Sequence, residues 1–181
     1  MRAPVSSWLV LVHQIPPRPA YLRSKIARRL EQLAAVAIKN SVYALPAGEQ
    51  AREDLSWVLR EIVAGGGNGS VLEASFVEGL SDEDVRELFR SARDAEYDVV
   101  REQARQLARQ VPRRSVSEKR RAILEPQLAR LGKRVAEIAA LDFFGARGRE
   151  PVEGLLRDLV RRLAPAPKGA EVGRASCRER V

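Results

Sequence analysis

The chain has 181 residues, and its 45% hydrophobic content is enough for one sizeable core with a smaller extension. The apolar run Trp8–Val12 is too short to span a membrane and lacks the cleavage pattern of a signal peptide, so we expect a cytoplasmic protein with no membrane contact. The formal charge of +8 favours a polyanionic partner, although a composition rich in Arg, Ala and Leu also produces such a charge without any function.

The last nine residues, Gly173–Val181, resemble the translation of a sequencing-library adapter rather than coding sequence. Removing them lowers the charge only from +8 to +6. The single cysteine, Cys177, lies in this tail, so we expect no disulfide, thiolate nucleophile or cysteine metal site. We therefore expect a truncated fragment, in which the natural sequence is cut off near Val172. Residues 165–172 are expected to form a Pro-rich linker.

The first half of the chain predicts alternating strands and helices. The run Trp8–Val12 ends at Ile15-Pro16-Pro17 and is typical of a central strand buried on both faces. Helical spacing of apolar residues and glycine-rich or proline-rich breaks divide the rest of this half. The expected elements are a strand at 8–15, a helix at 20–35, strands at 35–38 and 42–45, a helix at 49–64 and a strand at 70–77.

This order, β-α-β-β-α-β, predicts an α+β fold of the ferredoxin-like plan, with four antiparallel strands and both helices on one face. We assign the ferredoxin-like domain to residues 5–78. A helical domain is expected over residues 80–164, because periodicity changes to that of helices alone.

The helical extension begins with Ser81 and Asp84, which form a capping box for a helix of about 28 residues. Ser115 is expected to cap the next helix, and Pro126 to kink its first turns or to mark its start. A last helix is expected at 152–163.

The second of these three helices carries a hydrophobic seam with the four-three spacing of a short coiled coil. Its residues are Leu124, Leu128, Leu131, Val135 and Ile138.

No residue pattern indicates an enzyme. The glycines of Gly65–Gly69 follow a helix and precede a strand, which is the reverse of a phosphate-binding loop, so a turn is the better interpretation. His13, the only histidine, has no metal-ligand partner at a suitable spacing and is interpreted as a core or rim residue. We expect no catalytic residue, metal or cofactor.

Two basic clusters are the candidate DNA contacts. The first lies on the helix at 20–35, where Lys25 and Arg28 share a polar stripe with Tyr21 and Gln32. The second surrounds the break between the long helices. It consists of Arg113, Arg114, Lys119, Arg120 and Arg121. An ordinary solvated helix face is the competing interpretation of both.

Several segments together resemble the N-terminal domain of the chromate-resistance regulatory protein ChrB. They are WLVLV-x-x-IPP, the Arg-rich helix, VYALP, the Gly-rich turn before the fourth strand, LFR…EY in the long helix, and IAALDFFG followed by a final helix. The likeness extends over residues 5–163. Its structural motif residues are Trp8, Pro46, Asp142, Phe143 and Phe144. The resemblance implies a DNA-associated regulator of a chromate-efflux operon that responds to chromate. It also implies a second, C-terminal domain through which chromate would act and which is missing here.

The first strand, the Arg-rich helix and the -SVY- strand are also similar to the small ferredoxin-like nucleases of CRISPR spacer acquisition and to a module of PaaX-type repressors. The nucleases place an acidic residue at the end of the first strand, where this chain has Val12, His13 and Gln14. Without that carboxylate a metal-dependent nuclease lacks a ligand.

The main alternative is a protein-interaction module that does not bind DNA. In that interpretation the sheet edge and the hydrophobic seam Leu124–Ile138 form a homodimer or dock the missing C-terminal domain.

Overall fold

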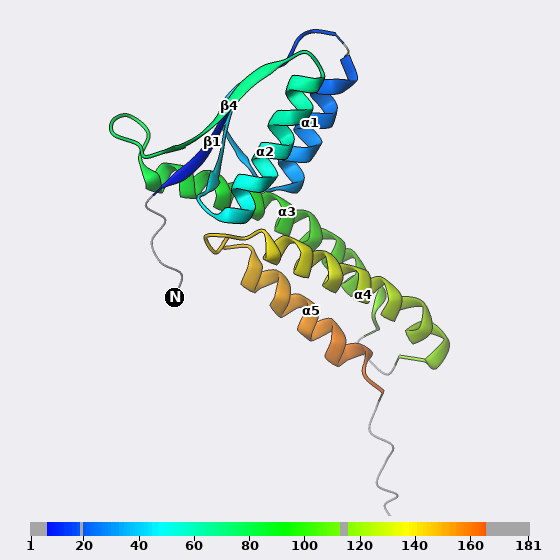
Figure 1. The fold of residues 1–181 in the computed structure, drawn as a ribbon. Coiled ribbons are helices and arrows are strands. Elements are labelled where there is room, and N and C mark those ends of the chain that lie inside the picture. The colour runs from blue at the N-terminus through cyan, green and yellow to red at the C-terminus, as the bar shows by residue number, and fades with distance from the viewer. Residues whose placement is uncertain (1–6, 19, 113–115, 166–181) are drawn as a thin grey trace, which may run out of the picture.

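The structure, a computed structural model, describes residues 7–18, 20–112 and 116–165, and this part contains a four-stranded antiparallel sheet and five helices (Figure 1). The predicted order of elements is confirmed. The expected tail, most of the expected linker, and Arg113, Arg114 and Ser115 lie outside the described residues. The elements are β1 (Trp8–Gln14), α1 (Ala20–Gln32), β2 (Val36–Lys39), β3 (Val42–Pro46), α2 (Glu49–Ala64), β4 (Asn68–Ala74), α3 (Asp82–Gln110), α4 (Glu118–Ala140) and α5 (Arg149–Leu163).

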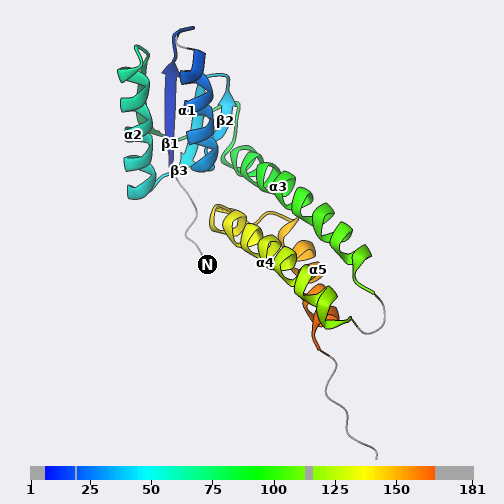
Figure 2. The same cartoon turned by 90° about the vertical axis from the view of Figure 1, so that its right-hand side faces the viewer.

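The sheet has the strand order β2-β3-β1-β4, so the apolar first strand is central, as predicted. Trp8 lies opposite Pro46 of β3 and Ala74 of β4. Alternate residues of a strand point to opposite faces, and the first four residues of β1 are buried on both. Leu9 and Leu11 are on the face covered by α1 and α2, which lie side by side in Figures 1 and 2, and Trp8 is on the other face.

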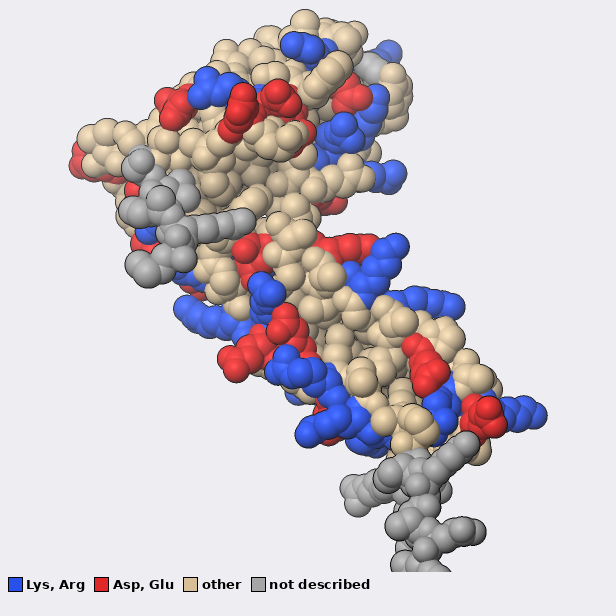
Figure 3. Space-filling model, turned by 60° about the horizontal axis from the view of Figure 1, so that its bottom comes forward, with Lys and Arg blue, Asp and Glu red and all other residues tan. Residues whose placement is uncertain are grey.

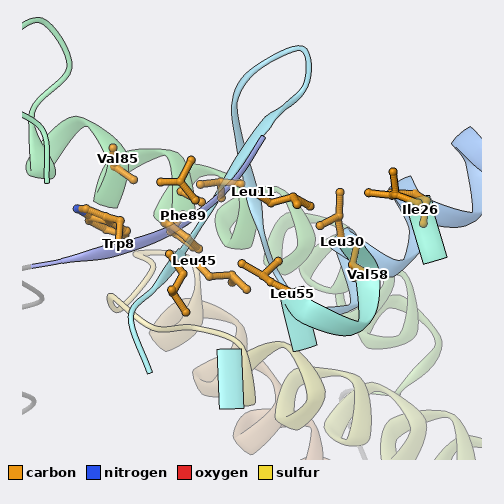
Figure 4. Close-up of a cluster of buried hydrophobic side chains, with 14 of the residues drawn as sticks. Trp8, Leu11, Ile26, Leu30, Leu45, Leu55, Val58, Val85 and Phe89 are labelled. Carbon is orange, nitrogen blue, oxygen red and sulfur yellow. The ribbon is translucent and has the colours of Figure 1, made fainter. Parts of the chain in front are cut away.

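The start of α3 covers that second face. The indole ring of Trp8 stacks on Phe89 with centroids 5.9 Å apart, and its Nε1 donates to Asp82 Oδ1 over 2.7 Å. Figure 4 shows the resulting core, which runs from Trp8, Val85 and Phe89 at one end to Ile26 of α1 at the other. The buried indole is therefore packed and hydrogen-bonded at once.

The rest of α3 packs with α4 and α5 into a three-helix bundle (Figure 2). The hydrophobic seam of α4 is inside this bundle, with Leu124, Leu128, Val135 and Ile138 buried and Leu131 partly buried. The seam therefore supplies the core of this chain and is not an exposed surface for a second copy.

Side-chain caps mark the starts of the two longest helices, α3 and α4. The capping box of Ser81 and Asp84 is present, and α3 begins directly after it. The cap of α4 is Ser117, whose Oγ accepts from the backbone N–H of Arg120, so the expectation of Ser115 is wrong. Pro126 lies inside α4 and does not mark its start.

The last strand begins two residues earlier than predicted, because its glycines allow close contact with β1. A Cβ at Gly69 would lie 2.6 Å from the carbonyl oxygen of Val12, and one at Gly67 would lie 2.7 Å from that of Gln14. Only glycine fits at such a distance, so a segment expected to be a plain turn takes part in strand pairing.

Among the described helices, none combines the length and apolarity needed to cross a membrane.

Tyr97 is fully buried in the bundle, and its hydroxyl has no hydrogen-bond partner among the described residues. Burial raises the pKa of Tyr97 to about 12, because the phenolate would be poorly solvated there.

We expect Tyr97→Phe to raise the free energy of unfolding by about 1 kcal/mol, because the substitution keeps the ring and removes an unsatisfied buried hydroxyl. Urea denaturation of the two proteins measures the difference. A loss of stability would show instead that the hydroxyl has a partner, such as a bound water molecule.

Candidate nucleic-acid interface

Helix α1 and the residue Arg18 before it carry exposed basic side chains. Arg18 just before the helix and Arg23, Arg28 and Arg29 on it are exposed, and within the described part of the chain none of the four has a hydrogen bond or an ion pair. Buried Leu22, Ile26 and Leu30 hold one side of the helix against the sheet; Arg28 lies nearly opposite this buried stripe, and Arg23 and Arg29 lie on its two flanks. In Figure 3, blue side chains line the edge of the upper part of the molecule, where α1 lies.

Lys25, the other predicted contact on this helix, is already paired. Its Nζ lies 2.6 Å from Glu61 Oε1 of α2, and both side chains are substantially exposed. An exposed pair of this kind contributes little stability, yet it lowers the net positive charge at this point. The unpaired arginines are therefore the stronger candidates for phosphate contacts on α1.

The described members of the second predicted cluster differ in whether their charged groups are already bound. Lys119 is exposed and has no partner within the described ranges. Arg120 donates from Nε and Nη2 to the carbonyl oxygen of Gln110, at 3.3 and 3.1 Å. Arg121 donates from Nε to the carbonyl oxygen of Leu163 over 2.7 Å, and its side chain is only 19% exposed.

These arginines cap helices. The last carbonyl groups of a helix lack partners within the helix and carry partial negative charge, so a guanidinium group there satisfies and stabilises them. Arg120 does this for α3 and Arg121 for α5. Arg162 of α5, which sequence reasoning missed, donates in turn to the carbonyl oxygens of Ala108 and Val111. The only signal for Arg162 was its place in a basic last turn of a helix.

We expect Arg121→Gln to lower the free energy of unfolding by about 2 kcal/mol, because the substitution removes a mostly buried carbonyl cap with a charge-assisted hydrogen bond. Lys119→Gln, which removes the same charge from the same turn, is expected to change it by less than about 0.5 kcal/mol. Urea denaturation of both variants checks this, and equal effects would contradict a capping role for Arg121.

His13 is half-buried at the end of β1. Its ring stacks on Tyr43 with centroids 5.7 Å apart, and neither ring nitrogen has a hydrogen-bond partner among the described residues. Burial lowers the pKa of His13 from 6.5, because the imidazolium would lose solvation. In the part of the chain that the structure describes, no group of three or more His, Cys, Asp or Glu side chains could hold a metal ion.

The lowered pKa of His13 predicts how stability depends on pH. Below pH 6.5 the unfolded chain binds a proton that the folded protein resists, so the free energy of unfolding falls as the pH drops through this range and is level above it. Because His13 is the only histidine, its imidazole signals in an NMR titration give the folded pKa directly. The fall in the free energy of unfolding at low pH should be smaller in His13→Gln than in the unchanged protein. An identical fall in both would show that His13 does not cause it.

The residues that carry the family likeness meet at one place, although they are far apart in the sequence. Phe144, in the turn between α4 and α5, lies 5.8 Å from the ring of Trp8 and 5.3 Å from that of Phe89. Phe143 packs edge-on against Phe89, and Pro46 pairs with Trp8 across the sheet.

Asp142 and Arg90 shape the turn that carries the two phenylalanines. The carboxylate of Asp142 accepts from the backbone N–H of Ala146 at 2.9 and 3.0 Å, which closes the turn. Arg90 of α3 donates to the carbonyl oxygen of Phe144 at 3.5 Å. This motif therefore holds the helical bundle against the sheet and offers no reactive group.

The sequence was also compared with known proteins. A family described as "Protein ChrB, N-terminal" matches residues 23–166, which include the arginines of α1, the aromatic turn and all of the bundle. Trp8 lies before the matched range. No curated protein matches the chain.

Proposed function

Because this chain belongs to the ChrB N-terminal family, we propose that it is the N-terminal part of a transcriptional regulator of chromate resistance that binds DNA. The observation that carries the DNA contact is the set of exposed, unpaired arginines along α1. Each can neutralise a backbone phosphate and release a condensed counterion. Arg113 and Arg114, which lie between α3 and α4 in the sequence, and Lys119 at the start of α4 supply a second contact in this proposal.

We infer a ferredoxin-like domain as the scaffold of this surface. The strand order, with β1 and β3 inside and β2 and β4 at the edges, supports it, and so does the position of α1 and α2 on one face. In such a layout α1 lies on the outer surface of the sheet's helical layer, where its basic side is accessible to a duplex.

The proposed role is not enzymatic. Val12, His13 and Gln14 end the first strand without a carboxylate, which argues against the metal-dependent nuclease chemistry of the similar spacer-acquisition proteins. Response to chromate is assigned in this proposal to a C-terminal domain, and the sequence here supplies the DNA-associated part.

Binding to the DNA upstream of the protein's own gene tests the proposal. We expect Arg23→Gln combined with Arg28→Gln to weaken this binding and to reduce the slope of log affinity against log salt by about 0.9 for each phosphate that is no longer neutralised. Fluorescence anisotropy over a series of salt concentrations gives both quantities. Arg113→Gln combined with Arg114→Gln separates the contribution of the second cluster.

The matched control removes two charges elsewhere. Arg130 and Lys133 of α4 are exposed and unpaired in the described structure, so their replacement by Gln changes the net charge equally and leaves α1 intact. Equal effects of the two double variants would mean that net charge, and not the α1 surface, causes binding. Affinity for the upstream DNA no greater than for random DNA at moderate salt would refute the regulator.

A protein-interaction module remains the second candidate, and exposed apolar residues on α2 favour it. Trp57 is 61% exposed and Val63 is 56% exposed, although the Arg60 guanidinium lies 4.9 Å from the Trp57 ring centroid and partly covers it. Size-exclusion chromatography of the chain and of Trp57→Ser distinguishes a dimer that uses this surface from a monomer.

A further inference from the structure

A cleft of about 940 Å³ lies where the sheet part meets the aromatic turn between α4 and α5. Its lining comes from the end of α1, the segment from the end of β3 to the start of α2, Arg86 of α3, and the turn after α4. Most of the surface is apolar, and its main apolar residues are Leu33, Leu45, Ala51, Leu141, Phe143 and Phe144. This volume is at the upper end of the range of small-molecule sites, which often form where two structural units meet.

Two carboxylates stand at this apolar cleft, Glu49 and Asp54 of α2, and neither has an ion pair in the described part of the chain. Glu49 is in the first turn of α2, where the positive end of the helix stabilises a carboxylate. Asp54 lies beyond that turn and has no such compensation. Its half-buried position beside apolar surface strengthens its attraction for a cation.

The charge of the cleft contrasts with that of the whole chain. The protein carries a formal charge of +8, and α1 is strongly basic, yet the unpaired charges in the cleft are negative. Arg86, which also lines it, is bound to Glu83 at 3.2 Å. An anionic ligand would therefore face the unpaired carboxylates Glu49 and Asp54, while a cationic one would pair with Asp54.

We propose that this cleft is a binding site for a small organic cation, a ligand with an aromatic or aliphatic body and one ammonium group. The body would lie on Leu45, Phe143 and Phe144, and the ammonium group would pair with Asp54. Since Phe143 and Phe144 also pack on Phe89, a bound ligand would contact the junction of the sheet and the bundle. The inference does not depend on DNA binding.

Phenylbutylamine and phenylbutyrate test this site, because they share one apolar body and carry opposite charges. Calorimetric titration of the full chain should show saturable binding of the amine and at least about tenfold weaker binding of the acid. Ala51→Leu, which fills part of the cleft, should weaken both.

Asp54→Asn should lower the affinity for phenylbutylamine about tenfold, the effect of losing one charge-assisted hydrogen bond. Glu53→Gln is the matched control, because this neighbouring carboxylate is exposed and does not line the cleft, so the affinity should not change. Equal binding of amine and acid, equal effects of the two variants, or no binding of either probe would overturn the proposal. None of these results would bear on DNA binding by α1.

Discussion

The packing of Trp8 connects the two parts of this molecule. Its ring contacts Phe89 of the long helix α3 and Phe144 of the turn after α4, and its Nε1 is satisfied by Asp82. Three segments far apart in the sequence therefore share one aromatic cluster, and its aromatic contacts add to the free energy of apolar burial. Helix α3 contributes to both hydrophobic clusters, so neither the sheet face nor the bundle is complete without it.

The position of a basic residue relative to helix ends decides whether its charge is available to a ligand. Arg120, Arg121 and Arg162 bind carbonyl groups at the far end of the bundle, where they substitute for the missing hydrogen bonds of helix termini. On α1 the arginines are exposed and have no hydrogen bond to such carbonyls within the described residues. A count of charges along the sequence treats the capping arginines and the arginines of α1 alike. Of these two groups, only the arginines of α1 keep their hydrogen-bond donors free for a ligand.

Local sequence signals predicted the helices well. Where the structure differs from the prediction, contacts between residues far apart in the sequence are the cause. The bounds of α2 agree at both ends with the expected 49–64, because its apolar period and the flanking glycines are local signals. The start of β4 was missed, since Gly67 and Gly69 are close to β1 only after folding. The acceptors of Arg162 could not be predicted either, because they lie more than fifty residues earlier in the chain. The cleft combines four distant segments, so no sequence pattern could indicate it.

Helix α1 belongs to both candidate surfaces, and this limits how they can influence each other. Its exposed surface carries Arg23 and Arg28, while Gln32 at its end and Leu33 just beyond it line the cleft. The buried side of α1 is held on the sheet by Leu22, Ile26 and Leu30. A ligand in the cleft can alter a DNA contact only by binding two arrangements of α1 with different affinity. Such arrangements would have to differ at the end of α1, because a shift of the whole helix would expose its buried leucines and isoleucine.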